Sequence, residues 1–216
     1  MRTCPSRRRI CSCGVALSLA IASLFAQDLT ITFDEDTPGQ PPPGFVFAAL
    51  RQTTVGTWEV LGDGTRRHLA HLADSSAPGL SMAVATAPAP EQLLITSRIR
   101  FVDGGRTGGL LWRYRDASNL YGVAVNLLAH EAVLHRVVGG NRVQLDRVGD
   151  INIDPEIWHT LGVLHRDGQI TVHLDGIAVL RAQDRGFELG RAGVWSAGAS
   201  TTWFDDVSIR SPGPRP

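Results

Sequence analysis

The sequence has no lysine, and its cysteines are confined to Cys4, Cys11 and Cys13. All 21 basic residues are therefore arginines, and 21 acidic residues balance them. No segment repeats apolar residues at the helical period, so the sequence does not predict a helical protein. It also contains no G-x-S-x-G nucleophile elbow, no phosphate-binding loop and no dinucleotide fingerprint, which argues against the enzyme classes that use those motifs.

Residues 1–26 have the pattern of a secretory signal rather than of a folded segment. Arginines come first, an apolar run follows as far as Phe25, and Ala26 ends the segment. A basic start, a short apolar middle and small residues near a cleavage site are typical of export signals. We predict cleavage after Ala26, with Ala20–Ala22 as an alternative, and residues 6–10 faintly match a twin-arginine signal. An uncleaved N-terminal anchor is the competing interpretation.

Cleavage after Ala26 would leave 190 residues without cysteine, with 17 arginines against 21 acidic residues and a net charge of −4. That length suffices for one domain with a substantial core, which has to be stable without disulfides. A mildly acidic chain has no electrostatic footprint for nucleic acid or for an anionic membrane. We therefore expect a secreted or periplasmic monomer with no nucleic-acid partner and no membrane span in the mature chain.

Short alternating runs, broken by Gly, Pro, Asn and Asp roughly every 8–12 residues, indicate an all-β protein. We predict a β-sandwich of two large antiparallel sheets with about 14 strands over residues 27–210. Residues 211–216 form a Pro-rich tail that we expect to be disordered. In the run from 93 to 101, alternation predicts one buried face. That face comprises Leu93, Ile95, Ser97, Ile99 and Phe101.

The segment Gly108–Asn126 predicts two strands around a short polar turn. In the return strand, Tyr121, Val123 and Val125 share one face, and Gly122, Ala124 and Asn126 share the other. If the valines face the core, the small residues leave an open floor that suits a flat ligand such as a sugar ring. One sheet is expected to curve, so that the outer face of its central strands forms a shallow groove.

Aromatic and histidine side chains can be assigned to faces in the same way. We predict that Trp112 lies in the core and that Arg113, on the other side of its strand, faces the groove. Apolar surroundings also predict core positions for Trp58, Trp158, Trp195 and Trp203. Spacing places His68 and His71 on opposite faces of one strand. We predict that His159, His165 and His173 lie on the outer face of the hairpin that begins at Trp158.

Three stretches resemble segments of secreted bacterial concanavalin A-like, or laminin-G-like, domains. They are GLLWRYRD at Gly109–Asp116 with Asn119–Tyr121, the strand pair from Trp158 to Gly176, and the closing GVW and WFDDV at Gly193–Trp195 and Trp203–Val207. These stretches occur in the order and at the spacing expected for such domains, and together they span nearly all of residues 29–210. The most similar group is labelled 3-keto-disaccharide hydrolase-like. The resemblance implies a jelly-roll fold and a carbohydrate or polysaccharide partner.

The chain departs from that group where the group carries charged residues. Ala124–Glu131 reads AVNLLAHE in place of RANALEDN, and Trp195–Ser200 reads WSAGAS in place of WTKADS. Several charged groups that could form a polar site are thus absent or changed. The departures favour binding over catalysis.

We predict a ligand site made of five side chains on or near the hairpin. They are Arg113, Tyr121, Asn126, His130 and Glu131. A retaining sandwich glycosidase needs two carboxylates about 5 Å apart, and no E-x-D-x-x-E motif is present. Glycoside hydrolysis of plain or keto-disaccharides, with Glu131 and Asp116 converging through the fold, is the alternative. A structural or adhesion role in the cell envelope is the third possibility.

Acidic residues at both ends of the domain favour a structural Ca²⁺ site. Asp34 follows the first predicted strand, and Asp205 and Asp206 lie in the last one. Terminal strands of such sandwiches usually pair, which would bring hard oxygen ligands together. The seven histidines show no dense metal-binding spacing, so the sequence does not predict a transition-metal site.

Overall fold

A computed structural model describes residues 28–50, 54–62, 66–74, 79–104, 106–155 and 157–214, and the predicted export signal lies outside these ranges. The strands are β1 (Leu29–Ile31), β2 (Phe45–Leu50), β3 (Thr57–Gly62), β4 (Arg67–Leu72), β5 (Leu80–Ala85), β6 (Leu93–Gly104), β7 (Thr107–Asp116), β8 (Asn119–Asn126), β9 (Glu131–Val138), β10 (Asn141–Val148), β11 (His159–Arg166), β12 (Gln169–Leu174), β13 (Ile177–Gln183), β14 (Arg191–Ala197) and β15 (Ser200–Arg210). This part of the chain contains no helix that is long and apolar enough to cross a membrane.

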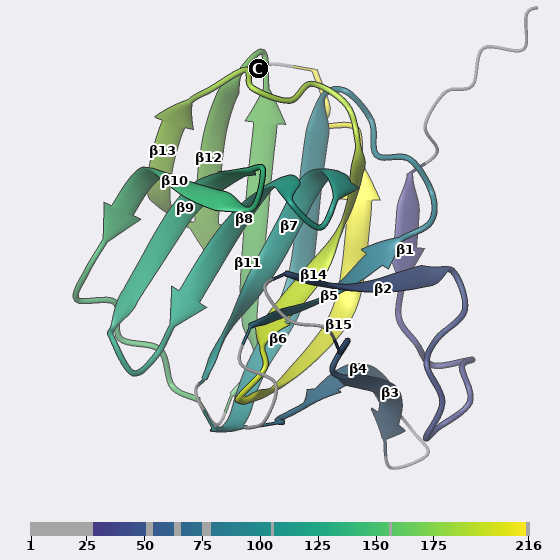
Figure 1. The fold of residues 1–216 in the computed structure, drawn as a ribbon. Coiled ribbons are helices and arrows are strands. Elements are labelled where there is room, and N and C mark those ends of the chain that lie inside the picture. Colours follow the sequence, from purple (N-terminus) through teal and green to yellow (C-terminus); the bar gives the residue numbers. More distant parts are fainter. Residues whose placement is uncertain are drawn as a thin grey trace, which may run out of the picture.

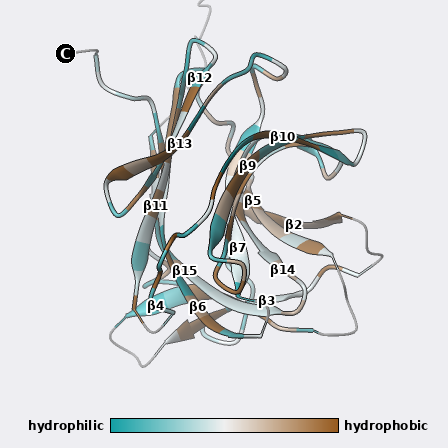
Figure 2. Ribbon diagram, turned by 90° about the vertical axis from the view of Figure 1, so that its left-hand side faces the viewer, coloured by the Kyte–Doolittle hydropathy of each residue, from teal (hydrophilic) through white to brown (hydrophobic). Residues whose placement is uncertain are grey.

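The strands form two antiparallel sheets that pack face to face (Figure 1). Sheet A has the order β13-β12-β11-β6-β15-β4-β3, with β1 also paired to β15. Sheet B has the order β10-β9-β8-β7-β14-β5-β2. Figure 2 views the layers from the side, with β11, β12 and β13 on the left and β9, β10 and β2 on the right. The all-β sandwich of two large antiparallel sheets is confirmed, with 15 strands among the described residues against about 14 expected.

The main core lies between the sheets and follows the alternation of each strand. On β6 the buried residues are Leu93, Ile95, Ser97, Ile99 and Phe101, as predicted. From sheet B, Leu110, Trp112 and Val123 face them. β6 lies between β11 and β15 within sheet A, and its apolar face is covered by sheet B.

Sheet B is strongly curved and carries a second apolar cluster on its outer face. That cluster comprises Leu50, Leu80, Met82, Val84, Leu111, Tyr114, Leu120, Val137 and Trp195. The curvature is visible where the β9–β10 turn approaches β2, from the opposite edge of the sheet. A Cβ on Gly140 in that turn would lie 3.9 Å from Cδ1 of Leu50. The outer face of sheet B is therefore concave, as the sequence predicts for one of the sheets.

A β-bulge interrupts the alternation of β7 at Arg113. The pairing register shifts there against both β8 and β14, and Arg113 has a φ of 52°. A bulge inserts one unpaired residue and redirects the side chains that follow. Tyr114 consequently joins Leu111 in the outer cluster, although simple alternation would place it with Leu110 in the core.

Trp112 joins the two sheets at the centre of the core. Its ring stacks on Tyr121 with centroids 5.7 Å apart, and its Nε1 donates a hydrogen bond of 3.0 Å to Nδ1 of His165 in sheet A. The core position predicted for Trp112 is therefore confirmed.

The histidines follow the predicted faces only in part. His165 and His159 are buried, contrary to the outer positions predicted for them, because each satisfies a buried hydrogen bond. His68 lines a pocket on the outer face of sheet A and His71 is fully buried, so their opposite faces are confirmed.

Residues 211–214 are tied to the domain, in contrast to the disorder expected for the tail. The backbone N–H of Ser211 donates to a carboxylate oxygen of Asp28 at 3.0 Å. The guanidinium of Arg166 donates to the carbonyl of Pro212 at 3.1 Å. These polar contacts link the tail to Asp28, which precedes β1, and to Arg166 on β11. Sequence periodicity does not register such contacts.

The two-sheet core predicts the stability of a matched pair of isoleucine variants. Ile99 is 1% exposed and Ile177 is 70% exposed. Ile99→Ala should lower the free energy of unfolding by roughly 2–5 kcal/mol, because a cavity remains in the core. Ile177→Ala should change it by less than about 0.5 kcal/mol. Urea denaturation checks both values, and equal effects of the two substitutions would contradict the assignment of faces.

Candidate functional site

The concave outer face of sheet B holds a groove of about 630 Å³. Its lining comes from β5, β7, β8, β9, β10 and β14. The lining residues are Gly79, Leu80, Thr107, Ala124, Asn126, Glu131, Val133, His135, Arg142, Gln144, Trp195 and Ala197. A volume of this size lies within the range of about 300–1,000 Å³ that is usual for small-molecule sites.

Small residues on β8 form the floor of the groove, as the sequence predicts. Ala124 lines it directly, and the ring of His135 covers Gly122. A Cβ on Gly122 would lie 2.9 Å from Nε2 of His135, so a larger residue would displace that ring. The indole of Trp195 lies beside it, with Nε1 donating to the carbonyl of Val123 at 3.0 Å. The floor is therefore flat, rigid and largely apolar.

His135 contributes a neutral ring to this floor at pH 7. Burial and the nearby Arg142 lower the pKa of His135 to about 4. The ring packs edge-on against Trp195, with centroids 6.5 Å apart. A ligand on the floor consequently meets aromatic edges and methyl groups instead of a charge.

Polar side chains surround the floor. Glu131 accepts hydrogen bonds from Arg147, whose Nε and Nη2 lie 2.6 and 2.5 Å from the same carboxylate oxygen. Asn126 accepts from the backbone N–H of Ala129 at 3.1 Å, which closes the β8–β9 turn. Arg142 and Gln144 extend from β10 and are exposed. The rim thus offers both donors and acceptors.

The structure brings together two of the five predicted ligand residues. Asn126 and Glu131 pair across β8 and β9 and both line the groove. His130 lies outside the lining, in the exposed turn before β9, with a φ of 51°. Arg113 and Tyr121 also lie elsewhere.

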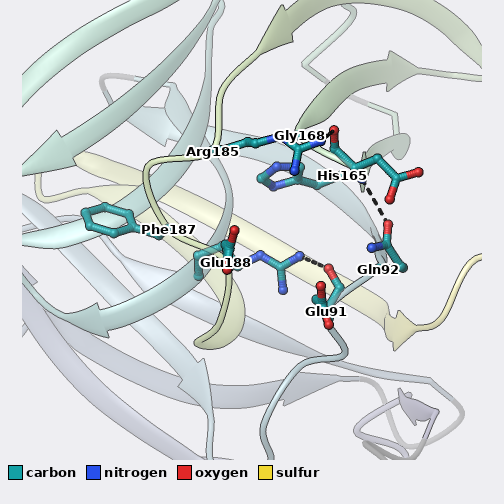
Figure 3. A pocket seen from close by; sticks show the side chains of 9 residues that line it. Glu91, Gln92, His165, Gly168, Arg185, Phe187 and Glu188 are labelled. Atoms are coloured by element: carbon teal, nitrogen blue, oxygen red, sulfur yellow. Dashed lines mark hydrogen bonds between the residues drawn. The ribbon is translucent and has the colours of Figure 1, made fainter.

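Arg113 lies at the end of the sandwich, so its predicted place in the groove is wrong. The bulge in β7 turns its side chain toward the loop before β6, where Nη1 donates to the carbonyl of Pro90 at 2.7 Å and Nη2 to that of Glu91. It is only 2% exposed. Figure 3 shows Glu91, Glu188 and His165 around this end cavity, whose volume is about 60 Å³. That space suits a few water molecules and is too small for a sugar ring.

Tyr121 is a core residue that holds a loop in place. Its hydroxyl hydrogen-bonds to the carboxylate of Asp184 and accepts from the N–H of Phe187 at 3.3 Å. Arg136 completes this network with an ion pair of 2.6 Å to Asp184. With no exposed surface, Tyr121 cannot touch a ligand in the groove.

Sequence reasoning missed most of the groove lining, including His135, Arg142, Gln144 and Trp195. The sequence did contain a signal for His135. Because β8 and β9 form a tight antiparallel pair, Glu131, Val133 and His135 face the same side as Asn126, Ala124 and Gly122. β10, which carries Arg142 and Gln144, follows β9 through a tight hairpin at Gly139–Gly140, so its position is also local. The position of Trp195 depends on the long-range pairing of β14 with β7 and β5, which no local pattern reveals.

The groove contains one carboxylic acid among its described lining residues, Glu131. Asp116 pairs with Asn119 at the start of β8, whereas Glu131 pairs with Asn126 at its end. At about 3.3 Å per residue, these positions are roughly 23 Å apart along the strand. Asp116 instead caps its turn by accepting from the N–H of Ser118 at 2.7 Å. The convergence of Glu131 and Asp116 that the hydrolytic alternative considers is therefore not present.

The acidic residues proposed for Ca²⁺ interact with arginines. Asp34 accepts from the backbone N–H of Arg67 at 2.9 Å. Asp205 and Asp206 share Nη1 of Arg98, at 3.5 and 3.6 Å. Across the described ranges, no group of three or more acidic, histidine or cysteine side chains could hold a metal ion. The Ca²⁺ site stays a prediction, and an ion there would have to displace Arg98.

Comparison with known proteins identifies the fold. No protein-family model and no curated protein matches the sequence. Among solved structures, the carbohydrate-binding module CBM66 from Bacillus subtilis is 22% identical, with a TM-score of 0.63 over 76% of this chain and 95% of that chain. The fold is the concanavalin A-like jelly roll.

Enzymes share this jelly roll with the binding module. A structure described as a native glycosidic hydrolase is 13% identical, with a TM-score of 0.58 over 90% of this chain and 100% of that chain. A Bacillus licheniformis β-glucanase is 11% identical, with a TM-score of 0.55 over 86% of this chain and 98% of that chain. Because one fold hosts several activities, function has to be argued from the site.

The Ca²⁺ prediction can be tested by thermal unfolding with and without EDTA. A structural ion stabilises the folded state only while it is bound, so its removal should lower the midpoint temperature. Asp205→Asn and Asp206→Asn should each abolish that response. An unchanged midpoint in EDTA would rule out a structural Ca²⁺.

The buried histidines predict how stability depends on pH. Burial lowers the pKa of His135 and His165 to about 4, against about 6.5 in an unfolded chain. Below pH 6.5 the unfolded chain therefore binds protons that the folded protein does not, and the free energy of unfolding falls as the pH decreases toward 4. Each histidine should account for roughly 2 kcal/mol between pH 7 and pH 5.

Urea denaturation of His135→Gln and the wild type at both pH values isolates this effect. Asp205 acts in the opposite sense, because burial raises its pKa to about 6 and stability falls as the pH rises through that value. Comparing variant with wild type cancels the Asp205 contribution. Identical pH dependence in the two proteins would contradict the neutral state assigned to His135.

Proposed function

We propose that this protein is a carbohydrate-binding module without catalytic activity, and that the groove on sheet B binds the carbohydrate. The observation that carries the proposal is a flat apolar floor, formed by Ala124, Val133 and Trp195, beside a polar rim with a single carboxylate. A sugar ring has an apolar C–H face and a perimeter of hydroxyl groups. The apolar floor matches the C–H face of the sugar, and the polar rim matches its hydroxyl groups.

The electrostatics of the groove support a binding role. Glu131 already forms an ion pair with Arg147, and the ring of His135 is uncharged at neutral pH. Hydrolysis by the usual mechanism needs a second carboxyl group as acid, base or nucleophile. The groove offers hydrogen bonds and apolar contacts, which suffice for recognition.

The structural relatives support the same class of ligand. The similar Bacillus subtilis protein is described as a carbohydrate-binding module, and other relatives are described as a glycosidic hydrolase and a β-glucanase. We extend the proposal to oligosaccharides or polysaccharides outside the cytoplasm, because residues 1–26 have the pattern of an export signal. A disaccharide with a keto group is one candidate within this class.

Binding can be tested with a matched pair of glutamine variants. Gln144 is exposed on the groove rim, and Gln169 is exposed on β12 of sheet A. The wild type should bind on an array of neutral and acidic oligosaccharides, and calorimetry should quantify the best of them. Gln144→Ala should bind roughly three- to tenfold more weakly, through loss of a hydrogen bond worth about 1 kcal/mol, and Gln169→Ala should not change. Absence of binding on the array would refute the proposal.

The same experiment separates binding from hydrolysis. Incubating the protein with each bound oligosaccharide, followed by chromatography of the products, should show intact sugar. Turnover that disappears in Glu131→Gln would identify an enzyme and overturn the non-catalytic assignment. Binding by the wild type without any cleavage of the sugar supports a binding module without catalytic activity.

A further inference from the structure

A second pocket lies on the outer face of sheet A, on the opposite side of the sandwich from the groove. Its volume is about 360 Å³, and its lining includes His68, Arg66, Arg98, Trp158, Trp203 and Asp205. The side chains come from β4, β6 and β15 and from the residue that precedes β11. Neither the core nor the groove uses them.

Two tryptophans expose aromatic surface in this pocket, although apolar surroundings predict them to be core residues. Trp158 and Trp203 are half-buried, and their ring centroids are 6.4 Å apart. His68 packs against both, at 5.8 Å from Trp158 and 4.3 Å from Trp203. Partly exposed tryptophans gathered in a concave site are a common feature of binding surfaces.

Strand pairing brings these rings together in a defined register. Trp203 on β15 lies opposite Arg100 on β6 and Ala70 on β4, and Asp205 lies opposite Arg98. Both tryptophan rings are also held by arginines, since Arg98 lies 4.8 Å from the ring of Trp158 and Arg100 lies 5.2 Å from that of Trp203. The rings are thus fixed before any ligand arrives, which lowers the entropic cost of binding.

Polar groups stand beside the rings. The carboxylate of Asp205 is largely buried and lies 3.5 Å from Nη1 of Arg98. Burial raises the pKa of Asp205 to about 6, which is unusual for a carboxyl group outside a binding or catalytic site. Nε1 of Trp203 is buried and has no hydrogen-bond partner among the described residues. Asp205 and Arg98 thus place hydrogen-bonding groups at the edge of the aromatic surface.

From this geometry we infer that the pocket is a second saccharide-binding site, so that the module is bivalent. The inference rests on the proposed function and adds a site to it. The tryptophan faces fit the C–H face of a sugar, and Asp205 and the arginines fit its hydroxyl groups. The surrounding arginines disfavour a cationic ligand, although an aromatic cage would otherwise suit one. A net charge of −4 for residues 27–216 disfavours a nucleic acid.

Two sites on opposite faces have a functional consequence. A polysaccharide chain, or two neighbouring chains, can occupy both sites at once, and the second contact then forms at a high effective concentration. The module should therefore hold a polymer roughly a hundredfold more tightly than a short oligosaccharide.

Four proteins test the inference on the oligosaccharide array used above: the wild type, Trp158→Ala, Gln144→Ala and the double variant. Gln144→Ala should weaken the groove roughly three- to tenfold and Trp158→Ala should weaken the second site roughly tenfold, each leaving the other site unchanged, and the double variant should be weakened at both sites. If Trp158→Ala binds like the wild type while Gln144→Ala binds weakly, the second site is refuted and the groove stands. If only Trp158→Ala loses binding, the groove proposal fails and the second site stands alone. No binding by any protein refutes both.

Controls guard against loss of folding in Trp158→Ala. Arg66→Ala removes an exposed side chain of the pocket and should weaken binding in the same way, whereas Arg210→Ala, exposed on the same sheet, should have no effect. Trp158→Phe keeps an aromatic ring and should restore most of the binding. Thermal unfolding should show that Arg66→Ala, Trp158→Phe and the wild type are all folded. If Arg66→Ala then binds as tightly as Trp158→Phe and the wild type, the inference is also overturned.

Discussion

The hydrogen bond between Trp112 and His165 crosses the interface of the two sheets, and most other features depend on it. It places an indole from sheet B against an imidazole from sheet A at 3.0 Å, inside a core that lacks disulfides among the described residues. Tyr121 stacks on the same indole and anchors the loop at Asp184. Directly after Trp112 the strand bulges at Arg113, and the arginine closes the end of the sandwich.

This arrangement leaves the outer face of β8 to small residues. Gly122 accommodates the ring of His135, and Ala124 remains open at the floor of a curved sheet. The groove therefore follows from two constraints: valines on β8 fill the core, and the absence of bulk on the other face permits a ligand to approach. Its polar rim comes from neighbouring strands.

The two faces of the sandwich differ in how they handle polar groups. On sheet B the groove combines an uncharged floor with a carboxylate already paired to Arg147. On sheet A the tryptophans stand beneath arginines and next to Asp205, the buried carboxyl group. Both faces offer apolar surface with hydrogen-bonding groups at its edge, which is why we propose one ligand class for both.

Strand positions and the buried face of β6 were predictable, because alternation and turn residues are local properties of the chain. The open floor of β8 followed from the same period. The sequence predictions failed at residues whose positions depend on more than the local alternation of the strand. Alternation places Arg113 in the groove because it does not anticipate a bulge. Apolar neighbours place Trp158 and Trp203 in the core because they do not reveal which side of a sheet is covered.

The sequence by itself determined that this protein is an all-β sandwich of two sheets and that one strand presents small residues, since both depend on side-chain period and residue size. Only the tertiary structure decided which residues share a site. Trp195 on β14 meets Ala124 and His135 in the groove, and Trp158 meets Trp203 and Asp205 on the other face. The physical reason is that strands distant in the chain become neighbours through sheet pairing and curvature, and no local pattern carries that information.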